Sequence, residues 1–274
     1  MNRSYLFIPG DVPRMLQMLD VFEADAVIID LEDAVALNQK DEARHLTRNF
    51  LLKHRPKNIE VYIRINSIID DEHTAYKDLD MLIDLDIHGI VLPKINHVSL
   101  HKIETYLQQT KSALNIIGLV ETPEVFLDIM PIASHPRIKG LMLGAEDLTR
   151  IMNIERSLNG FNIHWPRSVI VFAMHSLGKE AIDTPYTLID DQTGLLSDAT
   201  TACELGFTGK AVIHPNHIAC INNAFSPSEA QLNHAKKIVE YAKKHQTSRF
   251  NLDGKMIDKP IIDKAIHMLE KFSQ

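Results

Sequence analysis

The sequence has few of the residues on which disulfide scaffolds and cysteine-based metal sites depend. It contains only two cysteines, Cys203 and Cys220, and their spacing matches neither a disulfide framework nor a metal-binding motif. Its 14 histidines are scattered, and no HExxH pair occurs among them. This usage fits a reducing compartment, and we expect neither cysteine to be catalytic.

Long hydrophobic runs and an excess of positive charge are also missing. No stretch approaches the roughly 20 apolar residues of a membrane span, and the apolar run near the N-terminus is too short for a signal peptide. The net charge of −7 disfavours nucleic acid as a general partner, although a local basic patch could still hold a phosphorylated cofactor. GxGxxG and GxxxxGK[ST] loops are absent. We therefore expect a cytoplasmic protein with no membrane or nucleic-acid partner.

What the sequence does have is a repeated strand pattern. A hydrophobic content of 45% with 24% charged residues is typical of a globular protein with a large core. Eight short apolar stretches each run into a polar or turn-forming residue at their C-terminal end, and segments of helical period lie between them. These stretches cover residues 5–10, 26–33, 61–66, 89–94, 116–122, 140–147, 180–185 and 210–215.

Strands alternating with helices predict a parallel sheet, either an open doubly wound sheet or a closed barrel. Polar endings on nearly every strand, rather than at one switch point, favour an α/β fold of the (β/α)8 TIM barrel type, in which the chemistry sits at the C-terminal ends of the strands. The chain is therefore expected to be an enzyme.

The chain continues beyond the eighth strand. We predict a catalytic barrel over residues 1–225 and a C-terminal helical extension over residues 226–274. The extension is predicted to contain a helix with Ser226 or Ser228 as its N-cap, a polar loop over residues 247–260, and a short final helix. Because a barrel does not require this segment, it is a candidate lid or an arm that reaches a neighbouring subunit.

Two carboxylates end neighbouring strands of the predicted barrel. Glu121 ends the fifth strand and Asp147 ends the sixth, so both would point into the same mouth. Mg²⁺ commonly takes one or two protein carboxylates and leaves its other positions to water or substrate oxygens. The alternative is that each carboxylate only caps a helix or pairs with a lysine.

Arg64 lies inside an apolar strand, where an arginine is costly to bury unless it meets an anion. It could bind a substrate carboxylate, or it could form a salt bridge to Asp30, Glu32 or Asp33. We expect some of these three acids to orient Arg64, Lys94 or a metal-bound water. Lys94 itself could be a Schiff-base nucleophile, but so many nearby acids favour a role as their charge partner.

Other polar residues near strand ends have two open interpretations. His214 could act as an acid or base, although a structural hydrogen bond is favoured, and Asp183 has the same ambiguity. Four basic residues in or after the first two strand–loop regions could contact cofactor phosphates, although for any one of them a solvated surface role is the simpler expectation. They are Arg3, Arg14, Lys40 and Arg44.

Eight motifs together resemble a known family. RSYLFIPG, DLEDAV followed by KDEAR, IRIN, LPK, GLVET, LGAEDL, GFTGKAVIHP and GKMIDKP occur in one order along the chain. In this they resemble the citrate lyase β-subunit (CitE-like) family, which is related to the malyl-, methylmalyl- and citramalyl-CoA lyases of the HpcH/HpaI aldolase superfamily. The resemblance covers essentially the whole chain, including the C-terminal extension.

This resemblance implies a Mg²⁺-dependent (β/α)8 barrel that cleaves or forms a carbon–carbon bond next to a thioester of coenzyme A (CoA) or an acyl-carrier protein. It implies that Glu121 and Asp147 hold the metal and that Arg64 holds the carboxylate of a 2-oxo acid. In the LGAEDL motif, Gly144 and Ala145 would contact the substrate.

The GKMIDKP motif carries the remaining implied role. Asp258 matches an acid/base aspartate that reaches the active site of a neighbouring subunit, which implies a homo-oligomer, commonly a trimer or a multiple of one. On its position alone, Asp258 is only a residue at the start of a helix.

The choice of substrate within the family rests on three stretches. VALNQKDEAR, AEDLTRIMNIERS and NLDGKMID are more like citrate lyase β subunits, so we expect a citryl thioester, with citrate lyase α and γ subunits as possible partners. The IHP of the eighth strand is closer to stand-alone CitE-like proteins.

The alternatives are a malyl- or citramalyl-CoA lyase with possible thioesterase activity, a class II aldolase of hydroxy-oxo acids, and a non-catalytic scaffold subunit. The presence of Arg64, Glu121, Asp147 and Asp258 speaks against the scaffold.

Overall fold

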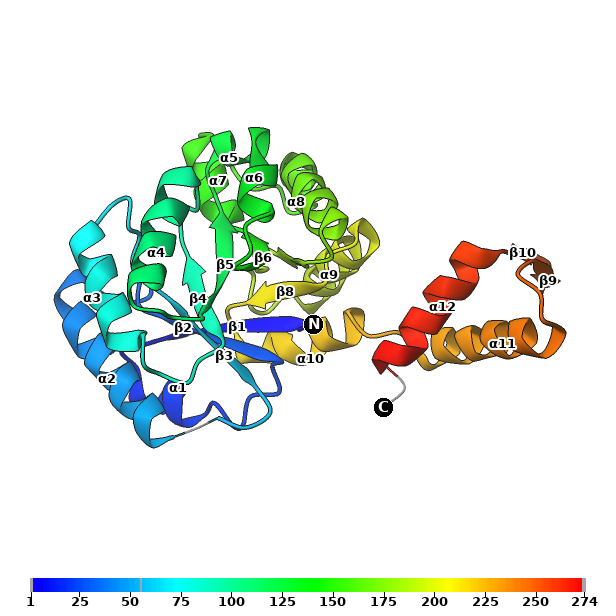
Figure 1. Ribbon diagram of the computed structural model, residues 1–274, viewed down its shortest axis with the longest axis horizontal. Coiled ribbons are helices and arrows are strands. Elements are labelled where there is room, and N and C mark those ends of the chain that lie inside the picture. The colour runs from blue at the N-terminus through cyan, green and yellow to red at the C-terminus, as the bar shows by residue number, and fades with distance from the viewer. Residues whose placement is uncertain (1, 55, 273–274) are drawn as a thin grey trace. The chain divides into compact units, whose positions relative to one another are not determined.

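Eight parallel strands close into a barrel, as predicted. A computed structural model describes residues 2–54 and 56–272. Each strand pairs with the next along the chain, and β1 pairs with both β2 and β8, which closes the sheet (Figure 1). The strands are β1 (Ser4–Pro9), β2 (Ala26–Asp30), β3 (Glu60–Arg64), β4 (Gly89–Leu92), β5 (Asn115–Val120), β6 (Ile138–Leu143), β7 (Glu180–Asp183) and β8 (Gly209–Val212).

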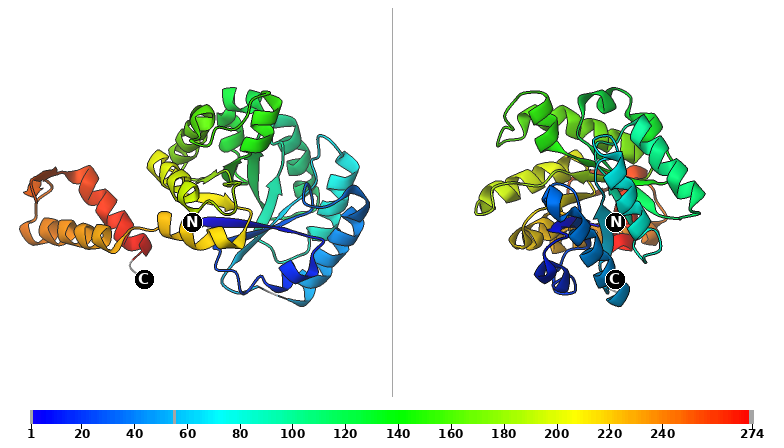
Figure 2. Two further views of the ribbon diagram at one scale, coloured as in Figure 1. Left: turned by 180° about the vertical axis from the view of Figure 1, so that it is seen from behind. Right: turned by 90° about the vertical axis from the view of Figure 1, so that its left-hand side faces the viewer.

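Helices surround the strands (Figure 2), so the (β/α)8 fold class is confirmed. The α-helices of this part are α1 (Pro13–Gln17), α2 (Lys40–Lys53), α3 (Glu72–Leu82), α4 (His97–Gln109), α5 (Pro123–Leu127), α6 (Ile129–Ala133), α7 (Ala145–Ile151), α8 (His164–Ser176), α9 (Gln192–Leu205) and α10 (Ile218–Ala224). Three 3₁₀ helices, η1 (Leu37–Gln39), η2 (Phe161–Ile163) and η3 (Pro215–His217), complete it.

The barrel interior is filled by side chains from all eight strands. Alternate residues point inward, because successive side chains of a strand lie on opposite faces of the sheet. The buried interior cluster consists of Tyr5, Ala26, Ile28, Tyr62, Val91, Ile117, Leu119, Met142, Ile182 and Ala211, with Phe7 packed against it. The same alternation, continued by one more step, decides which polar residues face the barrel mouth.

Local signals explain where several helices begin. At the start of α4, the Asn96 side chain accepts a hydrogen bond from the Ser99 amide while the Ser99 hydroxyl accepts one from the Asn96 amide. At α9, the Asp191 side chain accepts from the Gly194 amide, and Gly206 ends the helix at φ 104°. These caps anchor helices on the outside of the barrel.

The chain divides into two compact units, Met1–Asn222 and Asn223–Gln274. The second unit contains α11 (Glu229–His245), β9 (Phe250–Leu252), β10 (Lys255–Ile257) and α12 (Lys259–Phe272). Helices α11 and α12 pack on a small core that includes Ala235, Ile238, Ile257, Ile262 and Ala265. Of the two expected N-caps, Ser228 is the one that caps α11, through the Gln231 amide.

The segment expected to be a polar loop within the second unit is a β-hairpin instead. Strands β9 and β10 pair antiparallel around Asp253 and Gly254, whose φ angles are 51° and 79°. Positive φ at both central residues is the requirement of a type I′ turn, and Asp-Gly is one of its preferred sequences. The Asp-Gly signal was present in the sequence, but the two three-residue strands are too short to show a clear alternation.

Among the residues that the structure describes, no helix has both the length and the apolar character needed to cross a membrane.

Candidate functional site

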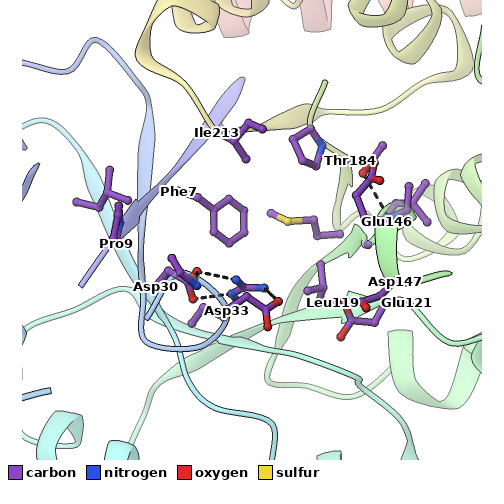
Figure 3. Close-up of a pocket in the computed structure, with 18 residues that line it drawn as sticks. Phe7, Pro9, Asp30, Asp33, Leu119, Glu121, Glu146, Asp147, Thr184 and Ile213 are labelled. Atoms are coloured by element: carbon purple, nitrogen blue, oxygen red, sulfur yellow. Dashed lines mark hydrogen bonds and ion pairs between the residues drawn. The ribbon is translucent and has the colours of Figure 1, made fainter. Parts of the chain in front are cut away.

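A cavity of about 480 Å³ opens at the C-terminal ends of the barrel strands. Strand ends and the loops that follow them supply its walls (Figure 3). Its lining residues are Phe7, Ile8, Pro9, Asp30, Asp33, Ala34, Arg64, Leu119, Glu121, Met142, Leu143, Gly144, Ala145, Glu146, Asp147, Thr184, Pro185 and Ile213. One part of the wall is therefore apolar and another carries several charges.

The inward alternation of the strands brings three charged residues to this cavity. Asp30 continues the inward series after Ile28, Arg64 continues it after Tyr62, and Glu121 follows Leu119 two positions on. In the sheet register Asp30 lies directly beside Arg64. The same geometry that fills the barrel core therefore places these charges at the mouth.

Arg64 is held by three carboxylates. Its Nε and Nη2 donate to the two oxygens of Asp30 at 2.7 and 2.6 Å, and its Nη1 lies 3.0 Å from Glu32 and 3.3 Å from Asp33. Its guanidinium also lies over the Phe7 ring, 5.3 Å from the ring centre. The salt-bridge alternative thus describes this structure, while the guanidinium also lines the cavity.

Asp30 has a second function in this arrangement. Its two oxygens accept from the Glu32 amide at 2.9 Å and the Ala34 amide at 3.1 Å, which shapes the turn after β2. That turn brings Glu32 and Asp33 toward Arg64.

Glu32 has a strongly shifted acidity. Burial raises the pKa of its carboxyl to about 8, and the charges of Asp33, Glu121 and Asp30 raise it further, while Arg64 counteracts them. At neutral pH the Glu32 carboxyl is therefore mostly protonated.

Glu121 and Asp147 form a second charged feature of the cavity and lie next to each other in Figure 3. Burial raises the pKa of Glu121 to about 7, and the Asp147 charge adds to the increase. The Lys94 amide donates to the Glu121 carboxylate at 2.6 Å and orients it. A Cβ on Gly144 would lie 2.7 Å from both Glu121 Cβ and Oε2, so the glycine leaves the space that this carboxylate fills.

Asp147 was expected to end the sixth strand, but it lies in the first turn of α7. Strand β6 stops at Leu143, and α7 starts at Ala145. The Asp147 carboxylate accepts from Arg150 Nη2 at 2.6 Å, in an exposed pair on the same helix. Because a helix starts immediately after the strand, the carboxylate still reaches the mouth.

The donor set of Glu121 and Asp147 fits a hard divalent cation. Two carboxylates that repel each other gain from a shared positive charge, and Mg²⁺ often uses only one or two protein carboxylates. Within residues 2–54 and 56–272, no cluster of three or more His, Cys, Asp or Glu side chains suits a metal ion, so other ligands would come from water or substrate.

Two predicted lysines have partners other than those expected. Lys94 Nζ pairs with Asp70, rather than with Asp30, Glu32 or Asp33, and its backbone adopts a left-handed φ of 46°. Lys40 Nζ donates to the Leu31 and Glu32 carbonyls at 2.8 and 2.5 Å. Lys40 thus binds the backbone of the turn after β2 with two of its three ammonium donors.

Three more residues that were expected to contact cofactor phosphates do not line the cavity. Arg3 directly precedes β1 and pairs with Asp25 before β2 at 2.7 Å, which places it at the opposite ends of the strands. Arg44 is buried against Asp78 at 2.8 Å. Arg14 is exposed on α1 and does not line the cavity.

Asp258 belongs to the second unit. It is exposed immediately before α12, and its side chain accepts from the Ile261 amide at 3.5 Å. This matches the helix-start position expected from its place in the sequence, and its role in a neighbouring site stays a prediction. The His214 ring accepts from the Asn216 amide at 3.3 Å, a local turn contact.

Sequence reasoning missed the apolar and hydroxyl groups of the wall. Phe7 and Met142 follow from the inward alternation, which could have identified them. Thr184 carries no such signal, since it comes after β7 has ended and is noticed only because its hydroxyl accepts from the Ala145 amide at 3.3 Å.

The comparisons with known proteins agree with this architecture. The family model "HpcH/HpaI aldolase/citrate lyase" matches residues 3–215. The chain is 32% identical to citrate lyase subunit beta of Haemophilus influenzae, over 99% of this chain and 97% of that protein. It is 30% identical to mitochondrial citramalyl-CoA lyase of Homo sapiens, over 96% of this chain and 83% of that protein.

Among solved structures, the CitE protein of Mycobacterium tuberculosis in complex with magnesium, acetoacetate and coenzyme A aligns with a TM-score of 0.83 at 28% identity. The alignment covers 99% of this chain and 98% of that one. With a family model that spans most of the chain and relatives that are named lyases, this chain is a lyase that belongs to the HpcH/HpaI aldolase/citrate lyase family.

Proposed function

We propose that this chain is a Mg²⁺-dependent lyase that cleaves a 3-hydroxyacyl thioester into a 2-oxo acid and an acyl thioester, with a citryl thioester of CoA or an acyl-carrier protein as substrate. The observation that carries the proposal is the cavity at the barrel mouth, where Arg64 lines one part of the wall and Glu121 and Asp147 line another. The relationship to a citrate lyase β subunit and to a CitE protein crystallised with magnesium and CoA supports it.

The bond changes are balanced. The substrate hydroxyl loses its proton and becomes the ketone of the oxo acid. The carbon–carbon bond breaks and leaves its electron pair on the carbon next to the thioester, and this carbon gains a proton. For citryl-CoA the products are oxaloacetate and acetyl-CoA.

The residues of the cavity suit this reaction. Arg64 would hold the carboxylate of the oxo acid and keep the reacting bond in position. Glu121 and Asp147 would hold Mg²⁺, which when bound supplies Lewis-acid stabilisation of negative charge on oxygen. Gly144 and Ala145 would lie against the substrate, beside the carboxylate of Glu121.

Asp258 would supply the proton to the carbon next to the thioester, in the active site of a neighbouring subunit. A positioned acid of this kind contributes roughly 10²- to 10⁴-fold in rate. The proposal therefore includes a homo-oligomer, with a trimer or a multiple of one as the expected form, and allows citrate lyase α and γ subunits as partners. The proposal also keeps the predicted division of the chain into a catalytic barrel, residues 1–225, and a C-terminal extension, residues 226–274.

A citramalyl-CoA lyase is the second candidate, because the chain is 30% identical to a protein of that name. The two candidates differ in the oxo acid that they release, which is oxaloacetate from citryl-CoA and pyruvate from citramalyl-CoA. Malyl-CoA would give glyoxylate.

The test is to incubate the purified protein with Mg²⁺ and, separately, with citryl-, citramalyl- and malyl-CoA and with a citryl acyl-carrier protein, and to identify the oxo acid. We expect the wild-type protein to release oxaloacetate. In Glu121→Ala the rate should be at least a hundredfold lower, which is about the effect of losing a general acid or a metal site. Glu124→Ala, an exposed glutamate three residues further on, is the matched control and should keep the wild-type rate. Release of no oxo acid from any of the four substrates would overturn the proposal.

A further inference from the structure

Four charged side chains form a buried cluster outside the cavity, on the outer face of the barrel wall. Asp183 ends β7 and Lys210 lies beside it on β8. Because Ile182 and Ala211 point into the barrel, these two neighbours point outward, toward Arg167 on α8 and Asp198 on α9. The exposed fraction of each of the four side chains is 6% or less.

The contacts within the cluster are complete. Arg167 Nε and Nη2 donate to the two oxygens of Asp183 at 2.9 Å each, and Nη2 also donates to Asp198 at 2.6 Å. Lys210 Nζ donates to Asp183 at 2.5 Å and to Asp198 at 2.7 Å. Two positive and two negative charges therefore compensate one another.

The third hydrogen bond of Lys210 leads from the cluster to the cavity. Lys210 Nζ donates to the Thr184 carbonyl at 2.7 Å, and Thr184 lines the cavity. The Thr184 hydroxyl then accepts from the Ala145 amide at 3.3 Å, at the start of α7. Helix α7 carries Asp147 in its first turn.

A second link runs beside the first. Arg156 Nη1 donates to the Pro185 carbonyl and to Glu146, both at 2.8 Å, and Pro185 and Glu146 line the cavity. Arg156 Nη2 lies 3.9 Å from Asp198 of the cluster. Arg156 thus connects Asp198 of the cluster to the turn after β7, beside the direct contact that Lys210 makes with that turn.

Burying four charges is a costly way to build a core, because an apolar cluster of similar volume is often equally stable or more stable. We propose that Arg167, Asp183, Asp198 and Lys210 form a positioning cluster that fixes the turn Thr184–Pro185 and, through Thr184, the start of α7. Its consequence for the reaction rests on the proposed function, since Asp147 on α7 is one of the two proposed metal ligands. None of the four touches the cavity, so they act through Thr184 and Ala145.

The main test is a charge-balanced replacement, Lys210→Met together with Asp198→Leu. It leaves the paired Arg167 and Asp183 in place but removes the donor to the Thr184 carbonyl. The matched control is Lys139→Met with Glu60→Leu, which removes an ion pair of 2.6 Å. Glu60 is the first residue of β3 and Lys139 the second residue of β6, so this pair lies at the other end of the barrel.

The first readout is hydrogen exchange measured by mass spectrometry in peptides covering residues 144–149 and 184–188, which does not depend on knowing the substrate. We expect about tenfold faster exchange in both peptides of the Lys210→Met/Asp198→Leu protein and wild-type exchange there in the control. On the thioester cleaved by the wild type, we expect kcat to fall about 10- to 100-fold with a smaller change in KM.

A second pair of variants covers the case in which the double variant does not fold. Thr184→Val removes the acceptor for the Ala145 amide while keeping the side-chain shape, and Thr184→Ser keeps it. We expect faster exchange over residues 144–149 in Thr184→Val and near-wild-type exchange in Thr184→Ser.

The outcomes separate the two proposals. Unchanged exchange over residues 144–149 in Lys210→Met/Asp198→Leu, or in Thr184→Val if the double variant is unfolded, would overturn the positioning role, whatever the wild-type enzyme cleaves. Wild-type protein that releases no oxo acid would overturn the proposed function and leave the exchange result to decide the positioning role by itself.

Discussion

Gly144 controls the space available to the Glu121 carboxylate. An added Cβ would lie 2.7 Å from Glu121 Oε2, and the backbone φ of −96° is one that alanine accepts, so Gly144→Ala should fold but displace the carboxylate. We expect Mg²⁺ affinity to fall about tenfold, a change typical of disturbing the support of a metal ligand. Isothermal titration calorimetry with Mg²⁺ alone measures this directly.

A second glycine provides the control for Gly144→Ala. Gly178 has a φ of 65° and no atom within 4 Å of an added Cβ, so Gly178→Ala should lower the thermal stability without changing Mg²⁺ affinity. Equal Mg²⁺ affinity in Gly144→Ala and wild type would show that the Glu121 carboxylate does not depend on this space.

Glu32 should make the stability of the protein depend on pH. Its pKa is about 8 in the folded protein against an ordinary value of 4.5, so the folded state binds its proton more tightly than the unfolded state does. The contribution of this tighter proton binding to the free energy of unfolding is fully present below pH 4.5 and is lost as the pH rises through about 8. We expect Glu32→Gln to lose less of its unfolding free energy than wild type between pH 6 and pH 9, on the order of 1 kcal/mol or more.

Urea unfolding at both pH values, with Mg²⁺ chelated, measures the Glu32 effect. Asp41→Asn is a suitable control, because the Asp41 carboxylate is exposed and its pKa is lowered rather than raised, chiefly by the hydrogen bond from Arg44. Parallel pH profiles for Glu32→Gln and wild type would contradict the assignment of this shift to Glu32.

The residues at the mouth differ in how far the sequence could predict them. Arg64 and Asp30 could be paired from the sequence, because both end apolar strands that are consecutive in the chain and a parallel register puts them side by side. The Asp70 partner of Lys94 lies 24 residues away in a loop, and no periodic pattern specifies where a loop places a side chain. Predicting such a pair requires the folded backbone.

At the scale of elements, strands were easier to predict than the segments that follow them. Each of the eight apolar stretches overlaps a barrel strand, because a strand buried on both faces must be continuously apolar. The polar residues after them were assigned to strand ends, whereas Asp147 belongs to a helix that starts two residues after β6. A boundary of this kind depends on tertiary contacts, such as that from the Ala145 amide to Thr184, rather than on local sequence.

The buried Lys210 illustrates a further limit of sequence reasoning at this scale. In the GFTGKAVIHP stretch it is a single charge within an apolar strand, and its partners come from β7 and α9. A strand pattern indicates that such a lysine must have partners. It does not say that the partners will be two aspartates and the carbonyl of a residue that lines the cavity.

At the scale of the whole molecule, the question is how Asp258 takes part in the reaction. It lies in the second compact unit, whereas Arg64, Glu121 and Asp147 lie in the first. If Asp258 acts in the site of a neighbouring subunit, as proposed, then an active site combines a barrel from one chain with an aspartate from another. Two inactive variants, one with a defective barrel and one without the aspartate, can then complement each other in a mixed oligomer.

We therefore predict that Arg64→Ala and Asp258→Ala are each inactive alone and regain activity when their subunits are mixed. In a randomly mixed ring of equal amounts, half of the barrels are intact and half of these receive an intact aspartate, so the activity should return to about one quarter of wild type. Denaturing the two proteins together, refolding them, and assaying release of the oxo acid measures this, and a mixture of Arg64→Ala with Glu121→Ala, which damages the barrel in every subunit, should stay inactive. If Asp258 served the barrel of its own chain, each mixed subunit would keep its own defect and no activity would return.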